Sequence, residues 1–110
     1  MDVEEARSLA LNGFKAEEYD HFGKPAYRIK AKRSGGKPGR TFMTLWIDEG
    51  HAFLMLNIDQ QAELVTHQPS GFEPHPSEWG AKGGTIAQLK QLNGTMFRQA
   101  LDPAVHHASR

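Results

Sequence analysis

The sequence predicts an α+β domain in which an antiparallel sheet packs against helices near both ends of the chain. Three observations support this fold class. Apolar and basic residues alternate over residues 25–32, which is typical of a strand with one face in solvent. Two further apolar segments follow at residues 40–48 and 51–57, separated by a short turn. Apolar residues recur at helical spacing in residues 2–12 and again in the segment that ends near Ala108.

Residues 25–57 predict a three-stranded meander at the centre of this sheet. Successive side chains of a strand point to opposite faces, so the first strand should place an apolar set in the core and a basic row in solvent. Residues 34–39, with sequence SGGKPG, form a flexible turn before the second strand. The two alternating sets of the first strand are Tyr27, Ile29 and Ala31 in the core, and Arg28, Lys30 and Lys32 in the basic row.

Capping residues indicate where the predicted helices begin. The acidic first turn of the helix over residues 2–12 suits the positive end of a helix dipole. Asp59 is the predicted N-cap of a second helix over residues 60–67. The side chains expected to face inward from this second helix are Ala62, Leu64 and Val65.

The last third of the chain predicts one more strand and one more helix. Residues 69–84 are rich in Pro and Gly and form a connection, and Thr85–Leu89 is expected to be an edge strand. Asn93 or Thr95 caps the C-terminal helix. Pro103 lies inside this helix and either kinks it or starts a separate last turn.

Charge is unevenly distributed along a chain that is neutral overall. Lys and Arg number 13, as do Asp and Glu, and residues 24–40 hold seven of the basic residues and no acid. The absence of cysteine excludes disulfides, thiolate metal sites and cysteine nucleophiles. No apolar run approaches the roughly 20 residues of a membrane helix. We therefore expect one cytoplasmic domain over residues 1–110 and no membrane partner.

The basic segment predicts an anionic partner, most simply DNA. Phosphate contacts of this kind hold a protein on nucleic acid without reading its sequence. The alternative is a solvated sheet face whose lysines prevent edge-to-edge association. The candidate phosphate contacts are Lys24, Arg28, Lys30, Lys32, Arg33, Lys37 and Arg40.

His21 and Trp79 mark two further candidate sites. His21 could act as a general acid or base, but we favour a folding role for the turn that it starts, with Phe22 in the core. Trp79 and the glycine-containing residues 80–84 could hold a phosphate or stack on a base. We favour a tryptophan that caps a small core. The other histidines show no metal-binding spacing.

Two motifs carry a resemblance that covers nearly the whole chain. Residues 21–28, HFGKPAYR, resemble the HFGKPAF stretch of the MmcQ/YjbR family of small bacterial proteins, and residues 79–85, WGAKGGT, are similar to that family's WGxxGWT segment. Gly84 is a departure, since the family usually has a second tryptophan there. The resemblance implies a CyaY-like, or double wing, α+β fold and a DNA-binding role by analogy of fold. It implies no catalysed reaction.

The sequence thus predicts a DNA-binding protein that contacts the phosphate backbone weakly through a basic hairpin. We expect no catalytic site, no cofactor and no small-molecule ligand, and the oligomeric state stays open. One alternative is a protein-interaction module whose basic face meets an acidic partner or the acidic N-terminus of another copy. The other is a protein that handles a small molecule or metal through His21 and the N-terminal acids. These acids are Asp2, Glu4, Glu5, Glu17, Glu18 and Asp20.

Overall fold

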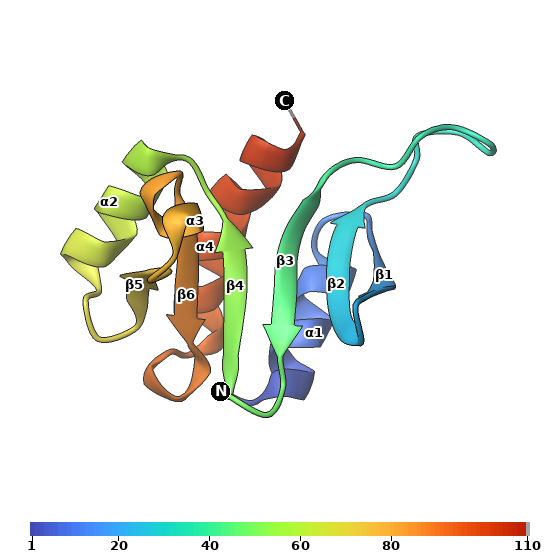
Figure 1. The fold of residues 1–110 in the computed structure, drawn as a ribbon. Helices are drawn as coiled ribbons and strands as arrows, with labels where there is room; N and C mark the ends of the chain where they lie inside the picture. Colours follow the sequence, from blue (N-terminus) through green and yellow to red (C-terminus); the bar gives the residue numbers. More distant parts are fainter. Residues whose placement is uncertain (110) are drawn as a thin grey trace.

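Six strands form one antiparallel sheet in the order β1-β2-β3-β4-β6-β5 (Figure 1). The computed structural model describes residues 1–109. The strands are β1 (Ala16–His21), β2 (Lys24–Ile29), β3 (Thr41–Trp46), β4 (His51–Met55), β5 (Phe72–Pro74) and β6 (Gly84–Gln88). The helices are α1 (Val3–Asn12), α2 (Ile58–His67), α3 (Glu78–Ala81) and α4 (Gly94–Ala108), with a single 3-10 turn, η1 (Leu89–Gln91), before α4.

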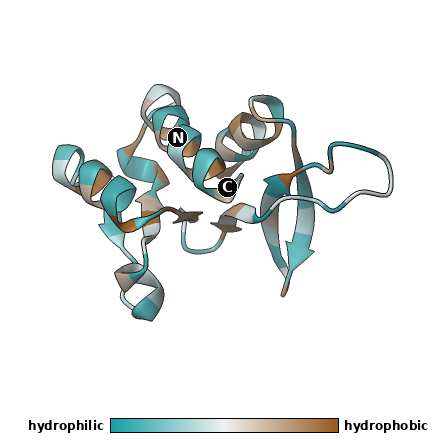
Figure 2. Cartoon of the chain, turned by 90° about the horizontal axis from the view of Figure 1, so that it is seen from above, coloured by the Kyte–Doolittle hydropathy of each residue, from teal (hydrophilic) through white to brown (hydrophobic). Residues whose placement is uncertain are grey.

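The helices α1 and α4 pack against one face of the sheet (Figures 1 and 2). They lie behind β2, β3 and β4 in Figure 1, whereas the short α3 lies on the opposite side, next to β6. The helix α2 packs at the β5 end of the sheet. The predicted α+β class is therefore confirmed, and the sheet has one face covered by helices and one face, here called the open face, without a long helix over it.

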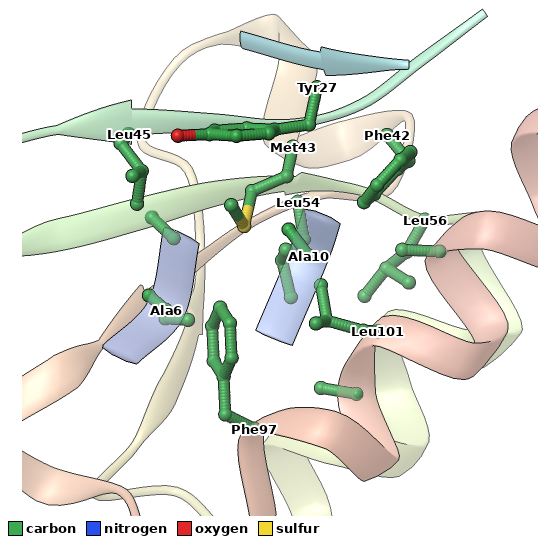
Figure 3. Close-up of a cluster of buried hydrophobic side chains, with 14 of the residues drawn as sticks. Ala6, Ala10, Tyr27, Phe42, Met43, Leu45, Leu54, Leu56, Phe97 and Leu101 are labelled. Carbon is green, nitrogen blue, oxygen red and sulfur yellow. The ribbon is translucent and has the colours of Figure 1, made fainter. Parts of the chain in front are cut away.

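The core lies between the sheet and the helices α1 and α4 (Figure 3). Met43 of β3 and Leu54 of β4 meet Phe97 of α4, and all three side chains are fully buried. Burial of a side chain of this size stabilises a fold by roughly 1.5–3 kcal/mol. The buried residues of α1 are Ala6 and Ala10, whose small side chains let this helix approach its neighbours closely.

Strand pairing determines which residues occupy the open face. Directly paired residues of neighbouring strands point to the same side of a sheet. Met43 pairs with Leu54 on the core side, so the next pair, Thr44 and Phe53, points to the open face. Trp46 lies two residues beyond Thr44 and shares that face. The meander therefore carries aromatic side chains on the side that no long helix covers.

The strand β2 is shorter than the strand predicted over residues 25–32. It ends at Ile29, whose carbonyl accepts a hydrogen bond from the backbone N–H of Gly39 at 2.8 Å. The next strand begins only at Thr41, so no neighbouring strand pairs with the residues directly after Ile29. Lys30 and Lys32 are exposed as predicted, but they lie in the loop between β2 and β3 and not on a strand. The predicted core position of Ala31 is wrong for the same reason, since Ala31 lies in this loop and is only partly buried.

The helix α2 also begins earlier than predicted. Its N-cap is Asn57 and not Asp59, because Asn57 and Gln60 form a reciprocal capping box with N···O distances of 2.8 and 2.9 Å. The inward face is shifted as well. Ala62, predicted to pack inward, is exposed, and the neighbouring Gln61 is buried instead.

The C-terminal part of the chain differs from prediction in the helix α3, which lies within the predicted connection, and in the position of β6. β6 is an interior strand, because β5 pairs with its outer side and forms the edge of the sheet. Asn93 caps α4 by accepting the N–H of Met96 at 2.9 Å, and the helix continues through Pro103 to Ala108. Within residues 1–109, no helix combines the length and apolar character that a membrane crossing requires.

A hydrogen-bonded group connects α1 to the first two strands. Glu18 of β1 accepts from the Arg7 guanidinium at 2.7 Å and from the Tyr27 hydroxyl at 2.6 Å. These bonds, with that of Arg7 first, lower the pKa of the Glu18 carboxyl. Burial, followed by the hydrogen bond to Glu18, raises the pKa of the Tyr27 hydroxyl.

The Glu18 carboxylate should make stability fall at acid pH. Because its pKa is lower in the folded chain, its contribution is present at neutral pH and disappears as the pH falls through and below the ordinary value of 4.5. We expect Glu18→Gln to lower the free energy of unfolding at pH 7 by about 1 kcal/mol and to flatten this acid dependence. Denaturant unfolding at a series of pH values measures both effects.

The control is Glu4→Gln, which removes an exposed carboxylate 3.8 Å from the same Arg7 guanidinium. Exposed pairs of this kind contribute little, so this variant should unfold like the wild type at every pH. An unchanged acid dependence in Glu18→Gln would contradict the assigned role of Glu18.

Candidate nucleic-acid interface

The seven predicted phosphate contacts fall into three different places. Arg28 lies within the sheet, and Lys24 and Arg40 border a cavity on the open face. The remaining four project from the loop between β2 and β3, which is here called the arm and comprises residues 30–40. The four arm residues are Lys30, Lys32, Arg33 and Lys37.

Arg28 stabilises the sheet. Its Nε atom lies 2.7 Å from the Glu17 carboxylate of β1, which is the directly paired residue. Its guanidinium also stacks 4.3 Å from the centre of the Tyr19 ring. Both the charge and the planar face of Arg28 are therefore already used within the β1–β2 hairpin, so we assign it no phosphate contact.

The arm extends away from the body of the molecule beyond the upper ends of β2 and β3 (Figure 1). Its base is closed by the Gly39 to Ile29 hydrogen bond, and the backbone N–H of Gly36 bonds to the Arg33 carbonyl at 3.0 Å. The four basic side chains of the arm are exposed and form no ion pair with any residue in 1–109. The arm is thus a positively charged projection.

Arg40 attaches the base of the arm to α4. Its Nη2 donates to the His107 carbonyl at 2.8 Å, and its Nε donates to the Ala108 carbonyl at 3.4 Å. The last carbonyls of a helix carry partial negative charge and lack partners within the helix, so a guanidinium is favourable there. This contact fixes where the arm leaves the sheet.

A cavity of about 820 Å³, here called the groove, lies on the open face. It is lined by residues from β1 to β4, by α3 and the segment before it, and by the end of α4. Two cations, Lys24 and Arg40, belong to this lining, and none of the described lining residues is a carboxylate. The aromatic and imidazole rings of the lining are Phe22, Trp46, Phe53, Trp79, His21, His75 and His107.

Contacts with neighbouring side chains hold the rings of the groove in place. The Trp46 ring stacks on the His51 ring with centres 5.7 Å apart and planes at 28°. Lys24 Nζ lies over Trp46, 4.4 Å from the ring centre, and contributes a cation–π interaction. Phe53 meets His75 edge to face at 5.3 Å. Burial lowers the pKa of His51, which favours the neutral imidazole beneath Trp46 at pH 7.

Trp79 forms one wall of the groove, and the prediction that it caps the core is wrong. Its residue surface is 51% exposed, and Lys82 Nζ lies 5.5 Å from its ring centre. The next residue, Gly80, is required by close packing, because a Cβ atom there would lie 1.8 Å from the His75 carbonyl oxygen. Gly84 is also enclosed, since an added Cβ would lie 2.6 Å from the Phe53 ring.

Phe22 forms another part of the groove rim, and its predicted place in the core is also wrong. It is 90% exposed. It begins the two-residue turn between β1 and β2 with φ of 53°, and Gly23 follows with φ of 85°, the sign pattern of a type I′ turn. Its ring lies edge-on to His21 at 4.8 Å. A bulky residue with positive φ is strained, and here no core contact offsets the strain.

The alternative of metal handling by His21 and the N-terminal acids receives no support from the geometry. No group of three or more potential metal ligands occurs within residues 1–109. Several of the acids serve the fold instead: Asp2 caps α1, and Asp20 accepts the Gly23 N–H at 3.3 Å. Glu17 and Glu18 pair with arginines as described above.

Three residues of the groove were not predicted from the sequence as site residues: Trp46, Phe53 and His75. A signal was present, because the aromatic residues Trp46 and Phe53 stand next to the core residues Leu45 and Leu54 in their strands. Two apolar sets in one strand are equally typical of a sheet buried on both faces. The sequence alone therefore did not show which set would remain uncovered.

The chain was compared with protein-family models, with curated proteins and with solved structures, and no match was found in any of the three comparisons.

The strained turn gives a test of whether Phe22 serves folding. We expect Phe22→Asn to stabilise the protein by about 1 kcal/mol, because Asn adopts the left-handed region more readily than Phe. This corresponds to a rise of about 4 °C in Tm for a domain of this size. Gly23→Ala at the next position should instead lower Tm. Thermal melts followed by circular dichroism measure both, and a lower Tm for Phe22→Asn would show that Phe22 supports the fold.

Proposed function

We propose that this protein binds nucleic acid through phosphate contacts made by the arm. The observation that carries the proposal is the set of four exposed cations on the projecting arm. Positive charge that is not neutralised within the protein attracts the phosphate backbone and releases its counterions. The resemblance of the chain to the MmcQ/YjbR family leads to the same expectation.

The proposed contacts are fewer than the seven basic residues of the sequence. Arg28 is excluded by its pairing with Glu17, and Arg40 holds the end of α4. The arm residues supply the phosphate contacts, and Lys24 lies apart from them on the open face. Contacts from flexible lysines to phosphate carry no sequence information, so we propose binding with little sequence preference.

The test is the salt dependence of binding to a labelled DNA duplex, followed by fluorescence anisotropy. If two to four arm cations contact phosphates, log K should fall with log salt at a slope of about −1.8 to −3.6. In the variant Lys32→Ala/Lys37→Ala we expect weaker binding and a slope reduced by about 1.8. Both residues are exposed in the loop, so the fold should be unaffected.

The matched control is Lys90→Ala/Arg98→Ala, which removes the same charge from η1 and α4, away from the arm. This variant should keep the wild-type slope. Equal weakening in both variants would indicate a response to net charge alone. The absence of binding at low salt would overturn the proposed function.

A further inference from the structure

We infer that the groove receives unpaired bases, so that the protein prefers single-stranded nucleic acid to duplex. This inference rests on the proposed function, because the same strand would place its phosphates along the arm. The groove and the arm are continuous: Arg40, the last residue of the arm, lines the groove together with its neighbour Thr41.

The residues that line the groove favour a ligand that combines an aromatic ring with a negative charge. Trp79 presents an exposed ring on which an aromatic ring can stack, and Trp46 and Phe53 add apolar surface to the same lining. Lys24 supplies positive charge, and none of the described lining residues has a carboxylate side chain that would oppose an anion. A nucleotide combines an aromatic base with a phosphate, and its chemistry matches both properties of the groove.

The open face also offers the geometry that unpaired bases need. Proteins that bind single strands commonly present aromatic side chains on a sheet surface beside positive charge. Here the β1–β2 turn and α3 both project on the side of the sheet opposite α1 and α4 (Figure 2). They carry the exposed rings of Phe22 and Trp79. Bases inside a duplex are stacked on one another, so they cannot reach rings recessed between these projections.

Phe22 gives an independent argument for a ligand at this place. Its positive φ is strained, and its edge-on contact with His21 still leaves 90% of its surface exposed. Strained residues of this kind concentrate where binding requires them. The ring belongs to the lining of the groove, where a stacked base would cover apolar surface that the protein itself leaves in water.

Three nucleic acids of equal length separate the contribution of bases from that of phosphates: oligothymidylate, an abasic strand and a duplex. Trp46 and Trp79 are the two tryptophans of the chain, and both line the groove, so intrinsic fluorescence reports its occupation directly. We expect oligothymidylate to quench this fluorescence. It should bind more tightly than the abasic strand by about 5- to 160-fold for each stacked base, and more tightly than the duplex.

Two variants separate the groove from the arm. Trp79→Ala and Phe22→Asn should each lower the affinity for oligothymidylate toward the affinity for the abasic strand. Neither variant should change the affinity for the abasic strand itself. The arm variant Lys32→Ala/Lys37→Ala should weaken binding of both strands. The control Ile58→Ala removes an apolar side chain that is 59% exposed and outside the groove, and should bind like the wild type. Circular dichroism confirms that each variant is folded.

The two proposals fail in distinguishable ways. If oligothymidylate, the abasic strand and the duplex bind with equal affinity that depends on salt and on the arm, the inference about the groove is overturned and the proposed function stands. Tighter binding of the duplex than of oligothymidylate would also overturn the inference about the groove and leave the proposed function standing. If none of the three binds at low salt, both proposals are overturned together.

Discussion

The helices α1 and α4 bury one face of the sheet, and through strand alternation this packing also determines what the open face carries. Each core residue of β3 and β4, such as Met43 or Leu54, has a neighbour that points the other way. Polar neighbours would leave an ordinary wet face on an antiparallel sheet. In this chain the neighbours include the aromatic residues Trp46 and Phe53, so the same packing that forms the core also places rings in the groove.

The wall of the groove at α3 depends on a second constraint, a buried amide. Gln61 is 8% exposed, and its Nε2 lies 2.9 Å from the carbonyls of both Gly80 and Gly84. These two bonds satisfy both donors of the amide, which matters because an unpaired buried donor costs about 1–3 kcal/mol. They also connect α2 to Gly80, the residue directly after Trp79 in α3, and to Gly84, where β6 begins. Four residues do not make a stable helix alone, so the position of Trp79 depends on this connection.

Alternation and spacing were sufficient to predict the meander, the two terminal helices and the α+β class, since these depend on local periodicity. The arm was not predictable in this way, because a basic row continues past Ile29 with the same alternation whether or not a partner strand is present. The exposure of Phe22 and Trp79 is likewise not a local property. It depends on which face the helices cover, and a bulky aromatic residue is more often buried than exposed.

Charge pairing in the first hairpin explains how a neutral chain acquires a polarised surface. The acids of β1 are not spread over the molecule, because Glu17 pairs with Arg28 and Glu18 with Arg7. In each pair an acid and an arginine neutralise each other at the first hairpin, and the cations of the arm are left without opposing carboxylates. Lys24 belongs to no ion pair within residues 1–109, and its ammonium lies over Trp46. Although the whole chain is neutral, the arm is therefore positively charged, and its last residue, Arg40, also lines the groove that contains Lys24.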